Sequence, residues 1–318
     1  MMKKALKNFH KPKWWVESAI PFARSQTAKS YSSIRYDPDA PICRLMSEDW
    51  DNLILLDACR FDQFERLNTI NGDLQTRTSL GSGTPEFLTK NFEGTTHHDT
   101  VYITANPMYR TKSLKDVFHE VIDVWGSEWD DQQKTVRPEK MAEATLEAYE
   151  EFPGKRIISH FMQPHYPFIG DSAREIGDHA GYEWAYRRVQ GEDATRDHST
   201  IWALLDEGKV DVEAVWRAYD ENLEIALPHV ERLVNTFDEK VVVTSDHGNL
   251  VNERITPFGK RVSGHPIETY TDELRKVPWL VISGETRKEI HEEEPQEHTN
   301  GDSDVVVDRL ADLGYVNT

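Results

Sequence analysis

The stretch Val241-Val242-Val243-Thr244-Ser245-Asp246-His247-Gly248 decides the fold and points to the site. Its first residues form a short β-branched apolar run, which is typical of a strand buried in a parallel sheet. The run ends abruptly in Asp246 and His247, and α/β proteins bind their ligands where such strands leave the sheet. A carboxylate oxygen beside an imidazole nitrogen suits a divalent metal. A helix-capping Asp beside a surface histidine would give the same pattern, so this segment leaves both interpretations open.

Other apolar runs repeat this pattern and alternate with helical ones. Short runs rich in apolar residues predict strands over residues 50–57, 101–107, 156–161 and 277–282. Amphipathic spacing predicts helices over residues 85–92, 138–152, 212–236 and 304–313. Pro228 should kink or divide the third of these helices. The polar segments are 77–83, 285–302 and 170–211, and we interpret the last as an insertion over the site. This alternation predicts an α/β fold, with a doubly wound, mostly parallel sheet flanked by helices.

The chain is strongly acidic, and its charge is unevenly distributed. Its 318 residues have a formal net charge of −19, and they suffice for one large α/β domain or two small ones. Residues 1–36 carry eight Lys or Arg against one Glu, whereas the remainder carries 29 against 55 acidic residues. Such an acidic body would repel phosphates, so we expect no nucleic-acid partner. The composition also suggests a surface adapted to high salt, although ordinary acidic proteins share it.

Residues 1–36 form a basic arm that we separate from a catalytic domain over residues 37–318. The Phe and Trp side chains of the arm could lie on an anionic membrane surface, and a solvated tail is the alternative. Its apolar stretch is interrupted by Glu17 and Pro21, which makes a poor signal peptide. No apolar run approaches the ~18–20 residues needed to span a bilayer.

The two cysteines, Cys43 and Cys59, do not form a C-x-x-C pair. A disulfide framework is therefore not expected, and a reducing compartment is the default. We accordingly predict a cytoplasmic protein, with peripheral membrane contact through residues 1–36 as an option.

Asp57 lies at the end of one predicted strand, and Asp246 follows the end of another. The ends of adjacent parallel strands lie only ~5–10 Å apart, so Asp57, Asp246 and His247 can share one ion. Ser82-Gly83-Thr84-Pro85 presents two hydroxyls at a predicted helix start, where Thr84 would be the N-cap. A helix N-terminus favours an anion, and a metal-bound hydroxyl there could attack phosphorus or sulfur. The alternative for Thr84 is a cap and nothing more.

Several short motifs in a fixed order resemble the alkaline phosphatase superfamily, and within it the sulfatase-like hydrolases and transferases. These motifs are Leu55-Leu56-Asp57, a hydroxyl before a helix, Gln163-Pro164-His165-Tyr166-Pro167, Thr244-Ser245-Asp246-His247-Gly248, Gly264-His265-Pro266 and Val277-Pro278-Trp279. The ending Arg309-Leu310-Ala311-Asp312-Leu313-Gly314-Tyr315 also resembles the tail of sulfatase-like chains. The branch includes lipid phosphoglycerol and phosphoethanolamine transferases. The resemblance covers residues 48–318 and implies an alkaline phosphatase-like fold, here with an abbreviated C-terminal subdomain.

The resemblance implies a role for each matching residue. Asp57, Asp246 and His247 match the ligands of one divalent metal, Zn²⁺ or Mn²⁺, with Ca²⁺ or Mg²⁺ as alternatives. His165 matches a histidine that contacts the transferred group or the leaving oxygen. His265 matches a histidine that ligates a second ion in two-metal members. For both histidines an ordinary loop residue is the alternative, and no Asp-x-x-x-His motif supplies a full second site.

The nucleophile of this branch is Thr, Ser, or a Cys or Ser converted to formylglycine. Conversion needs x-Pro-x-Arg after the modified residue, whereas Ser82 is followed by Gly83-Thr84-Pro85-Glu86. We therefore expect a direct hydroxyl nucleophile, Thr84 first and Ser82 second.

Four further polar residues lie near these motifs. Cys59 is interpreted as a small buried thiol and His160 as structural. Arg60 could bind a substrate oxyanion or pair with Asp62. Asn249 stands where many relatives have an acid, which would change only the surroundings of the ligands.

These observations predict a metal-dependent hydrolase or transferase of a phosphoryl-type group on a phosphate ester, acting through a covalent intermediate. The substrate would be a phosphate or sulfate ester, such as a lipid head group or a glycan. A sulfate-ester hydrolase is the alternative enzyme. A non-catalytic binding protein on the same fold is the alternative outside enzymes.

Overall fold

The computed structural model describes residues 42–295 apart from 113, 177–199 and 258, together with a few isolated positions before residue 42. The predicted arm, the helix over 304–313 and the middle of the insertion therefore lie outside the described residues, as does the tail that follows the helix. In the described part, no helix combines the length and apolar character needed to cross a membrane.

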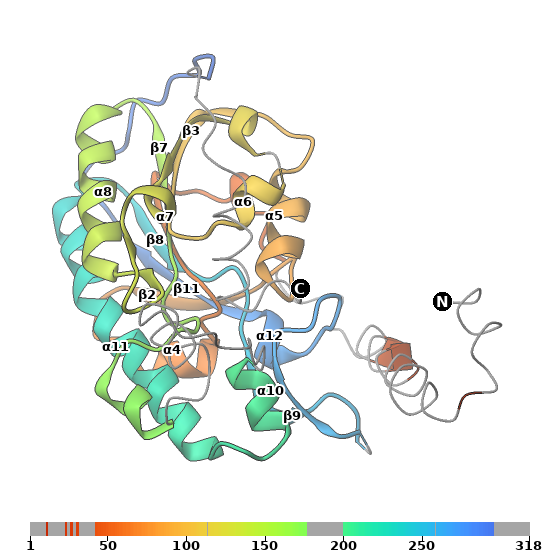
Figure 1. Ribbon diagram of the computed structural model, residues 1–318. Coiled ribbons are helices and arrows are strands. Elements are labelled where there is room, and N and C mark those ends of the chain that lie inside the picture. Colours follow the sequence, from red (N-terminus) through yellow and green to blue (C-terminus); the bar gives the residue numbers. More distant parts are fainter. Residues whose placement is uncertain are drawn as a thin grey trace.

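A seven-stranded sheet forms the centre of the molecule (Figure 1). Its spatial order is β2 (Asp73–Thr78), β11 (Lys276–Ile282), β8 (Val241–Thr244), β1 (Asn52–Leu56), β7 (Arg156–Phe161), β3 (His97–Thr104) and β4 (Phe118–Asp123). The four pairings from β8 to β4 are parallel, and β11 is antiparallel to both of its neighbours. The central strands β1, β7 and β8 are buried at every residue, which explains why they appear in the sequence as continuous apolar runs. The predicted mostly parallel sheet is confirmed.

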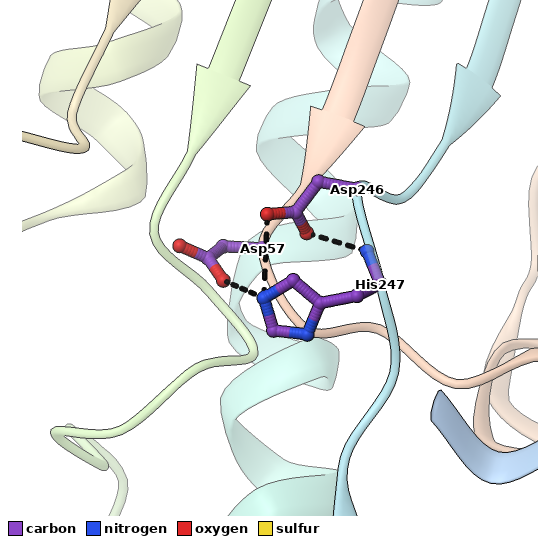
Figure 2. Close-up of side chains that lie close together, drawn as sticks. All are labelled: Asp57, Asp246 and His247. Atoms are coloured by element: carbon purple, nitrogen blue, oxygen red, sulfur yellow. Dashed lines mark hydrogen bonds and ion pairs between the residues drawn. The ribbon is translucent and has the colours of Figure 1, made fainter. Parts of the chain in front are cut away.

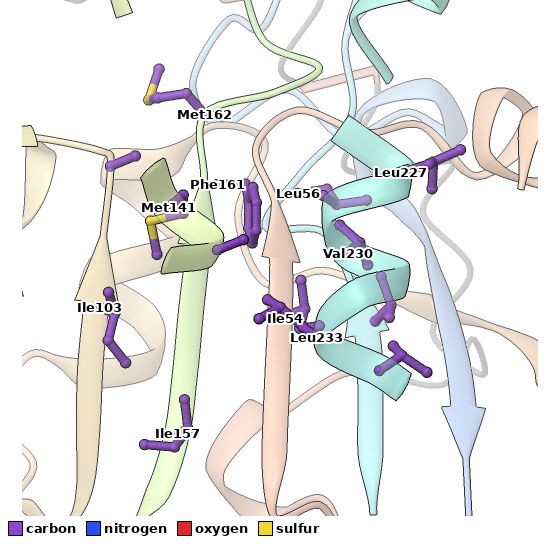
Figure 3. Close-up of a cluster of buried hydrophobic side chains, with 14 of the residues drawn as sticks. Ile54, Leu56, Ile103, Met141, Ile157, Phe161, Met162, Leu227, Val230 and Leu233 are labelled. Carbon is purple, nitrogen blue, oxygen red and sulfur yellow. The ribbon is translucent and has the colours of Figure 1, made fainter. Parts of the chain in front are cut away.

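Helices cover both faces of the sheet. Successive residues of a strand point to opposite sides, so the apolar strands present side chains to be buried on each face. In β1, Ile54 and Leu56 join one buried cluster, whereas Leu53 and Leu55 join another. The first cluster packs under α4 (Phe61–Leu67), α7 (Val124–Ser127), α8 (Pro138–Glu151) and α11 (Val212–Thr236) (Figures 1 and 3). The second packs under α5 (Thr84–Phe92), α6 (Met108–Thr111) and the 3-10 turns η2 (Leu45–Ser47) and η3 (Lys115–Val117).

Three features differ from the sequence predictions. Pro228 was expected to kink or divide its helix, and α11 continues through it as one element, so the helix is not divided there. The segment 77–83 was read as polar and irregular, but its first residues end β2, which is an edge strand of mostly half-buried residues. A hairpin of β9 (Leu250–Arg254) and β10 (Arg261–Gly264) occupies a region for which no strand was predicted. Short or half-exposed strands lack a sustained apolar run, and this removes the signal on which the predictions relied.

The remaining small elements lie outside the central sheet. They are β5 (Trp129–Asp130), β6 (Thr135–Val136), η4 (Asp171–Ile176), α10 (Ile201–Asp206) and α12 (Asp272–Arg275). The described ends of the 170–211 insertion pack with α11 and β9 in a third buried cluster. Trp202 of α10 lies close to Gly264: a Cβ atom added at Gly264 would be only 3.3 Å from the indole ring. The insertion thus contacts the residue that precedes His265.

Candidate metal and nucleophile site

Three fully buried side chains converge where β1 and β8 end (Figure 2). The two strands are parallel neighbours with Leu55 opposite Thr244, so Asp57 and Asp246 leave the sheet at the same edge. His247 Nε2 lies 3.5 Å from Asp57 Oδ1 and 3.4 Å from Asp246 Oδ2. One ligand atom from each of the three residues lies within 4.8 Å of the others, which fits a metal centre.

Hydrogen bonds fix the orientation of the Asp246 carboxylate. Its Oδ1 accepts from the amides of Ala58 (3.0 Å) and His247 (2.8 Å), which leaves Oδ2 facing the site. Burial alone raises the pKa of Asp246, but interactions with His247 and His160 and the donors around it bring that pKa below the usual value. Asp246 is therefore ionised, as a metal ligand must be.

The structure separates the two candidate nucleophiles. Thr84 Oγ1 donates to Asp246 Oδ2 at 2.7 Å and lies 3.1 Å from His247 Nε2. Ser82 Oγ lies instead within hydrogen-bond distance of Glu86 Oε2 (2.8 Å) and the Pro266 carbonyl (3.1 Å). The expectation that Thr84 is the N-cap was wrong: the cap is Gly83, and Thr84 is the first residue of α5. Its hydroxyl is directed at the carboxylate rather than at the helix amides.

His165 and His265 approach the same centre from two loops. Their Nε2 atoms are 3.0 Å apart, and the ring of His265 lies 4.7 Å from that of His247. Burial lowers the pKa of His165 to about 4, against the opposing effect of the Tyr166 carbonyl. Burial, His247 and His165 together hold the pKa of His265 well below its usual value. Both rings are therefore neutral at pH 7, and they lie beside the Asp57, Asp246 and His247 cluster rather than within it.

Sequence reasoning missed residues that support the metal-type cluster. Asn106, which follows β3, donates from Nδ2 to Asp57 Oδ2 at 2.5 Å. His160 closes on Asp246 from β7, and burial lowers its pKa to about 4, so its ring is neutral. The usable signal for Asn106 was its place after a predicted strand, the same place that singled out Asp57. The sequence had assigned His160 only a structural role.

Arg60 is engaged within the protein. Its guanidinium pairs with Asp62 (2.7 Å) and Glu253 (2.6 Å) and lies over the ring of Trp216. Of the two interpretations of Arg60, the structure shows the salt bridge to Asp62. Cys59 is fully buried, as expected.

Hydrogen bonds of Glu86 connect the His265 loop to the start of α5. Its carboxylate accepts from the Ser82 amide (3.0 Å), the Glu268 amide (3.2 Å) and Tyr270 Oη (3.1 Å), and it pairs with Lys90. Burial by itself raises the pKa of Glu86, but Lys90 and the Ser82 donors overcome this effect and lower the pKa to about 2. One carboxylate thus links the hydroxyl-bearing turn to the segment that carries His265.

We expect the Glu86→Gln variant to lose about 2 kcal/mol of unfolding free energy near pH 6. Because the folded pKa of Glu86 is depressed, its stabilisation is complete above the unfolded value near 4.5 and disappears as the pH falls towards 2. The difference between the two proteins should therefore shrink between pH 5 and pH 2.5, as measured by urea unfolding. Glu65→Gln, on the exposed side of α4, is the control. A difference that stays constant with pH would contradict this assignment.

Gly83 allows the His265 loop to approach the turn that carries Ser82 and Thr84. A Cβ atom at this position would lie 2.7 Å from Ile267 Cδ1 and 3.2 Å from His265 Nδ1. We expect Gly83→Ala to displace the His265 loop and lower turnover by roughly tenfold or more, since misplacements near 1 Å can cost about a hundredfold. Adding Ile267→Ala should recover part of the loss, because it removes the nearest atom. Steady-state kinetics of the single and double variants measure both effects, and equal turnover of Gly83→Ala and the unchanged chain would contradict the expectation.

Comparison with solved structures finds the same fold at very low sequence identity. Lipooligosaccharide phosphoethanolamine transferase A from Neisseria meningitidis, an integral membrane protein, matches with a TM-score of 0.50 and 10% identity, over 83% of this chain and 54% of that chain. This chain thus spans about half the length of that protein. The C-terminal periplasmic domain of EcEptC from Escherichia coli, in complex with zinc, matches with a TM-score of 0.45 and 14% identity, over 78% and 77% of the two chains.

A protein of the alkaline phosphatase superfamily from Vibrio parahaemolyticus matches with a TM-score of 0.40 and 12% identity, over 83% of this chain and 69% of that chain. No protein-family model and no curated protein sequence matches this chain. The likeness therefore concerns the fold. The chain has an α/β fold with a mostly parallel sheet, as predicted from its sequence, and the neisserial protein shares this fold.

Proposed function

We propose that this protein is a metal-dependent hydrolase or transferase of a phosphoryl-type group, with Thr84 as its nucleophile. One observation carries the proposal: the Thr84 hydroxyl is 2.7 Å from Asp246 and 3.1 Å from His247, two members of the buried Asp-Asp-His cluster. A hydroxyl that serves only as a helix cap would not be directed at two candidate metal ligands.

The donor set fits a divalent cation. Two buried carboxylates and one imidazole combine hard oxygen with borderline nitrogen, a set suited to Zn²⁺ or Mn²⁺. Two carboxylates fully removed from water are unfavourable side by side unless a positive charge compensates them. When bound, a divalent ion there would lower the pKa of a neighbouring hydroxyl and stabilise negative charge on the transferred group.

The side chains of the site suit an in-line displacement. Thr84 Oγ1 forms the new bond to phosphorus as the bond to the leaving oxygen breaks. Asp246 Oδ2, which already accepts from the hydroxyl, orients it, and the hydroxyl proton passes to solvent water. In this proposal the neighbouring His165–His265 pair contacts the leaving oxygen, which takes up its proton from solvent water. Water or an acceptor alcohol then cleaves the phosphothreonine ester and regenerates the hydroxyl.

The proposed substrates are phosphate esters, with phosphodiesters of lipid head groups as the first class to test. The neisserial protein that shares the fold is described as a phosphoethanolamine transferase, and this guides the choice of probes. In this chain Ser82 contacts Glu86 and Pro266, and Thr84 faces the cluster, which favours an unmodified hydroxyl over formylglycine.

The test uses the full chain, first stripped of metal and then supplied with Zn²⁺ or Mn²⁺. We expect stoichiometric metal binding and turnover of a chromogenic phosphodiester that exceeds turnover of the matching sulfate ester. Mass spectrometry after an acid quench should find a phosphoryl adduct on the peptide that contains Thr84. Preference for the sulfate ester, or formylglycine at Ser82 or Cys59, would replace the proposal with a sulfatase. If the chain showed neither metal binding nor turnover, the non-catalytic binding protein would replace the proposal.

A further inference from the structure

A buried histidine outside the proposed ligand set is directed at one of its carboxylates. His160, in β7, has no solvent exposure, and its Nδ1 lies 2.7 Å from the hydroxyl of Tyr102 in the neighbouring strand β3. Its Nε2 makes no hydrogen bond within the described part of the chain, and it lies 3.8 Å from Asp246 Oδ2. Thr84 Oγ1 donates to that same oxygen. The nucleophile and His160 therefore approach one atom from two sides.

The Tyr102 contact determines which nitrogen of His160 carries hydrogen. In a neutral imidazole one nitrogen donates and the other accepts. If the Tyr102 hydroxyl donates to Nδ1, the hydrogen resides on Nε2 and points towards Asp246. In the opposite tautomer Nε2 would present a lone pair to an ionised carboxylate, which is repulsive. The buried arrangement therefore selects the tautomer whose N–H dipole faces Asp246.

A buried donor without a hydrogen-bond partner lowers stability, so its presence needs a physical reason. Two members of the proposed site also approach Asp246 Oδ2, namely Thr84 Oγ1 at 2.7 Å and His247 Nε2 at 3.4 Å. The backbone donors from Ala58 and His247 occupy the other oxygen. His160 is therefore positioned to orient Asp246 Oδ2, the oxygen that faces the Asp57, Asp246 and His247 cluster.

We propose that Tyr102 and His160 are a positioning pair that sets the metal affinity of the Asp57, Asp246 and His247 cluster by directing an N–H dipole at Asp246 Oδ2. The inference rests on the proposed metal-dependent function. The pair orients the carboxylate and limits its rotation away from the site. Side chains that hold metal ligands in this way typically contribute about 10- to 100-fold to metal affinity.

The experiment measures the Kd of the full-length apoprotein for Zn²⁺ by chelator competition, independently of turnover. His160→Phe keeps an aromatic ring but removes both nitrogens, and we expect affinity to fall by about 10- to 100-fold. His160→Gln places an amide nitrogen near the position of Nε2 and a carbonyl near Tyr102, and it should restore affinity to within about threefold of the unchanged chain. Tyr102→Phe removes the hydroxyl that fixes the tautomer of His160, and it should weaken Zn²⁺ binding by about 3- to 10-fold.

Tyr109→Phe is the matched control, because Tyr109 is equally buried beside Tyr102 and its hydroxyl contacts Arg110 instead. Its Kd should not change. Thermal unfolding of each apoprotein reports whether it is folded, and if His160→Phe does not fold, Tyr102→Phe and His160→Gln decide. Unchanged affinity in folded His160→Phe, or in Tyr102→Phe, would overturn the positioning role while leaving the proposed function intact. An unchanged chain that binds no divalent metal would overturn both.

Discussion

Thr84→Ala should abolish turnover of a phosphodiester, with kcat reduced by at least about a thousandfold, because it removes the hydroxyl that attacks phosphorus in the proposed mechanism. The substitution removes the oxygen that lies between Asp246 and His247 and leaves the three buried cluster residues in place. Metal content should therefore stay near that of the unchanged chain. The measurement is kcat with saturating metal, together with the phosphoryl adduct on the Thr84 peptide, which should disappear.

Two variants make this prediction specific. Thr84→Ser keeps a hydroxyl at the same position and should retain measurable turnover and the adduct. Ser82→Ala removes the second candidate, whose oxygen contacts Glu86 and Pro266, so kcat should fall by less than about tenfold and stability by about 1 kcal/mol. If Ser82→Ala eliminated the adduct and Thr84→Ala did not, the assignment of the nucleophile would be reversed.

Asp246→Asn should eliminate metal binding and lower turnover on the order of a thousandfold, even with metal in excess. The amide has nearly the shape of the carboxylate but lacks its charge. It must also place an NH2 group against either the Ala58 and His247 amides or the Thr84 hydroxyl. The apoprotein should stay folded, since the change relieves repulsion between two buried carboxylates.

The thermal shift on metal addition gives a readout that does not depend on turnover. The unchanged chain should gain stability when metal binds its folded state, and Asp246→Asn should gain none. Asp220→Asn is a matched control, because Asp220 pairs with Arg66 at the outer side of α4 and α11. Full turnover of Asp246→Asn or Asp246→Ala in metal-replete buffer would show that the metal-site hypothesis is wrong.

Much of the fold was predictable because its central strands are buried on both faces. The runs that became β1, β7 and β8 had to be apolar throughout, and their patterns stand out from the polar segments around them. β2 was missed for the opposite reason, because it lies at the edge of the sheet and has β11 as its one neighbouring strand among the described residues. The antiparallel direction of β11 was not predicted, since a single short strand carries no signal for its direction.

The candidate site was predictable where a residue type and a strand end coincide. Asp57, Asp246 and His247 follow apolar strands, and the parallel arrangement brings such ends to one edge. Asn106 shares this placement, but an amide after a strand is common and was not singled out. The contact of Glu86 with the Glu268 amide and that of Tyr102 with His160 gave no local signal, because these partners lie far away in sequence.

The sequence by itself determined that Val241–Thr244 enters a buried sheet and that Asp246 and His247 follow where this strand ends. Apolar periodicity and the chemistry of the two side chains are local properties, and the chain carries them wherever it folds. The tertiary structure alone decided that Thr84 rather than Ser82 faces Asp246, and that Tyr102 and His160 stand behind the carboxylate. Those choices depend on angstrom-scale distances between segments up to 162 residues apart, which are set by packing across the sheet.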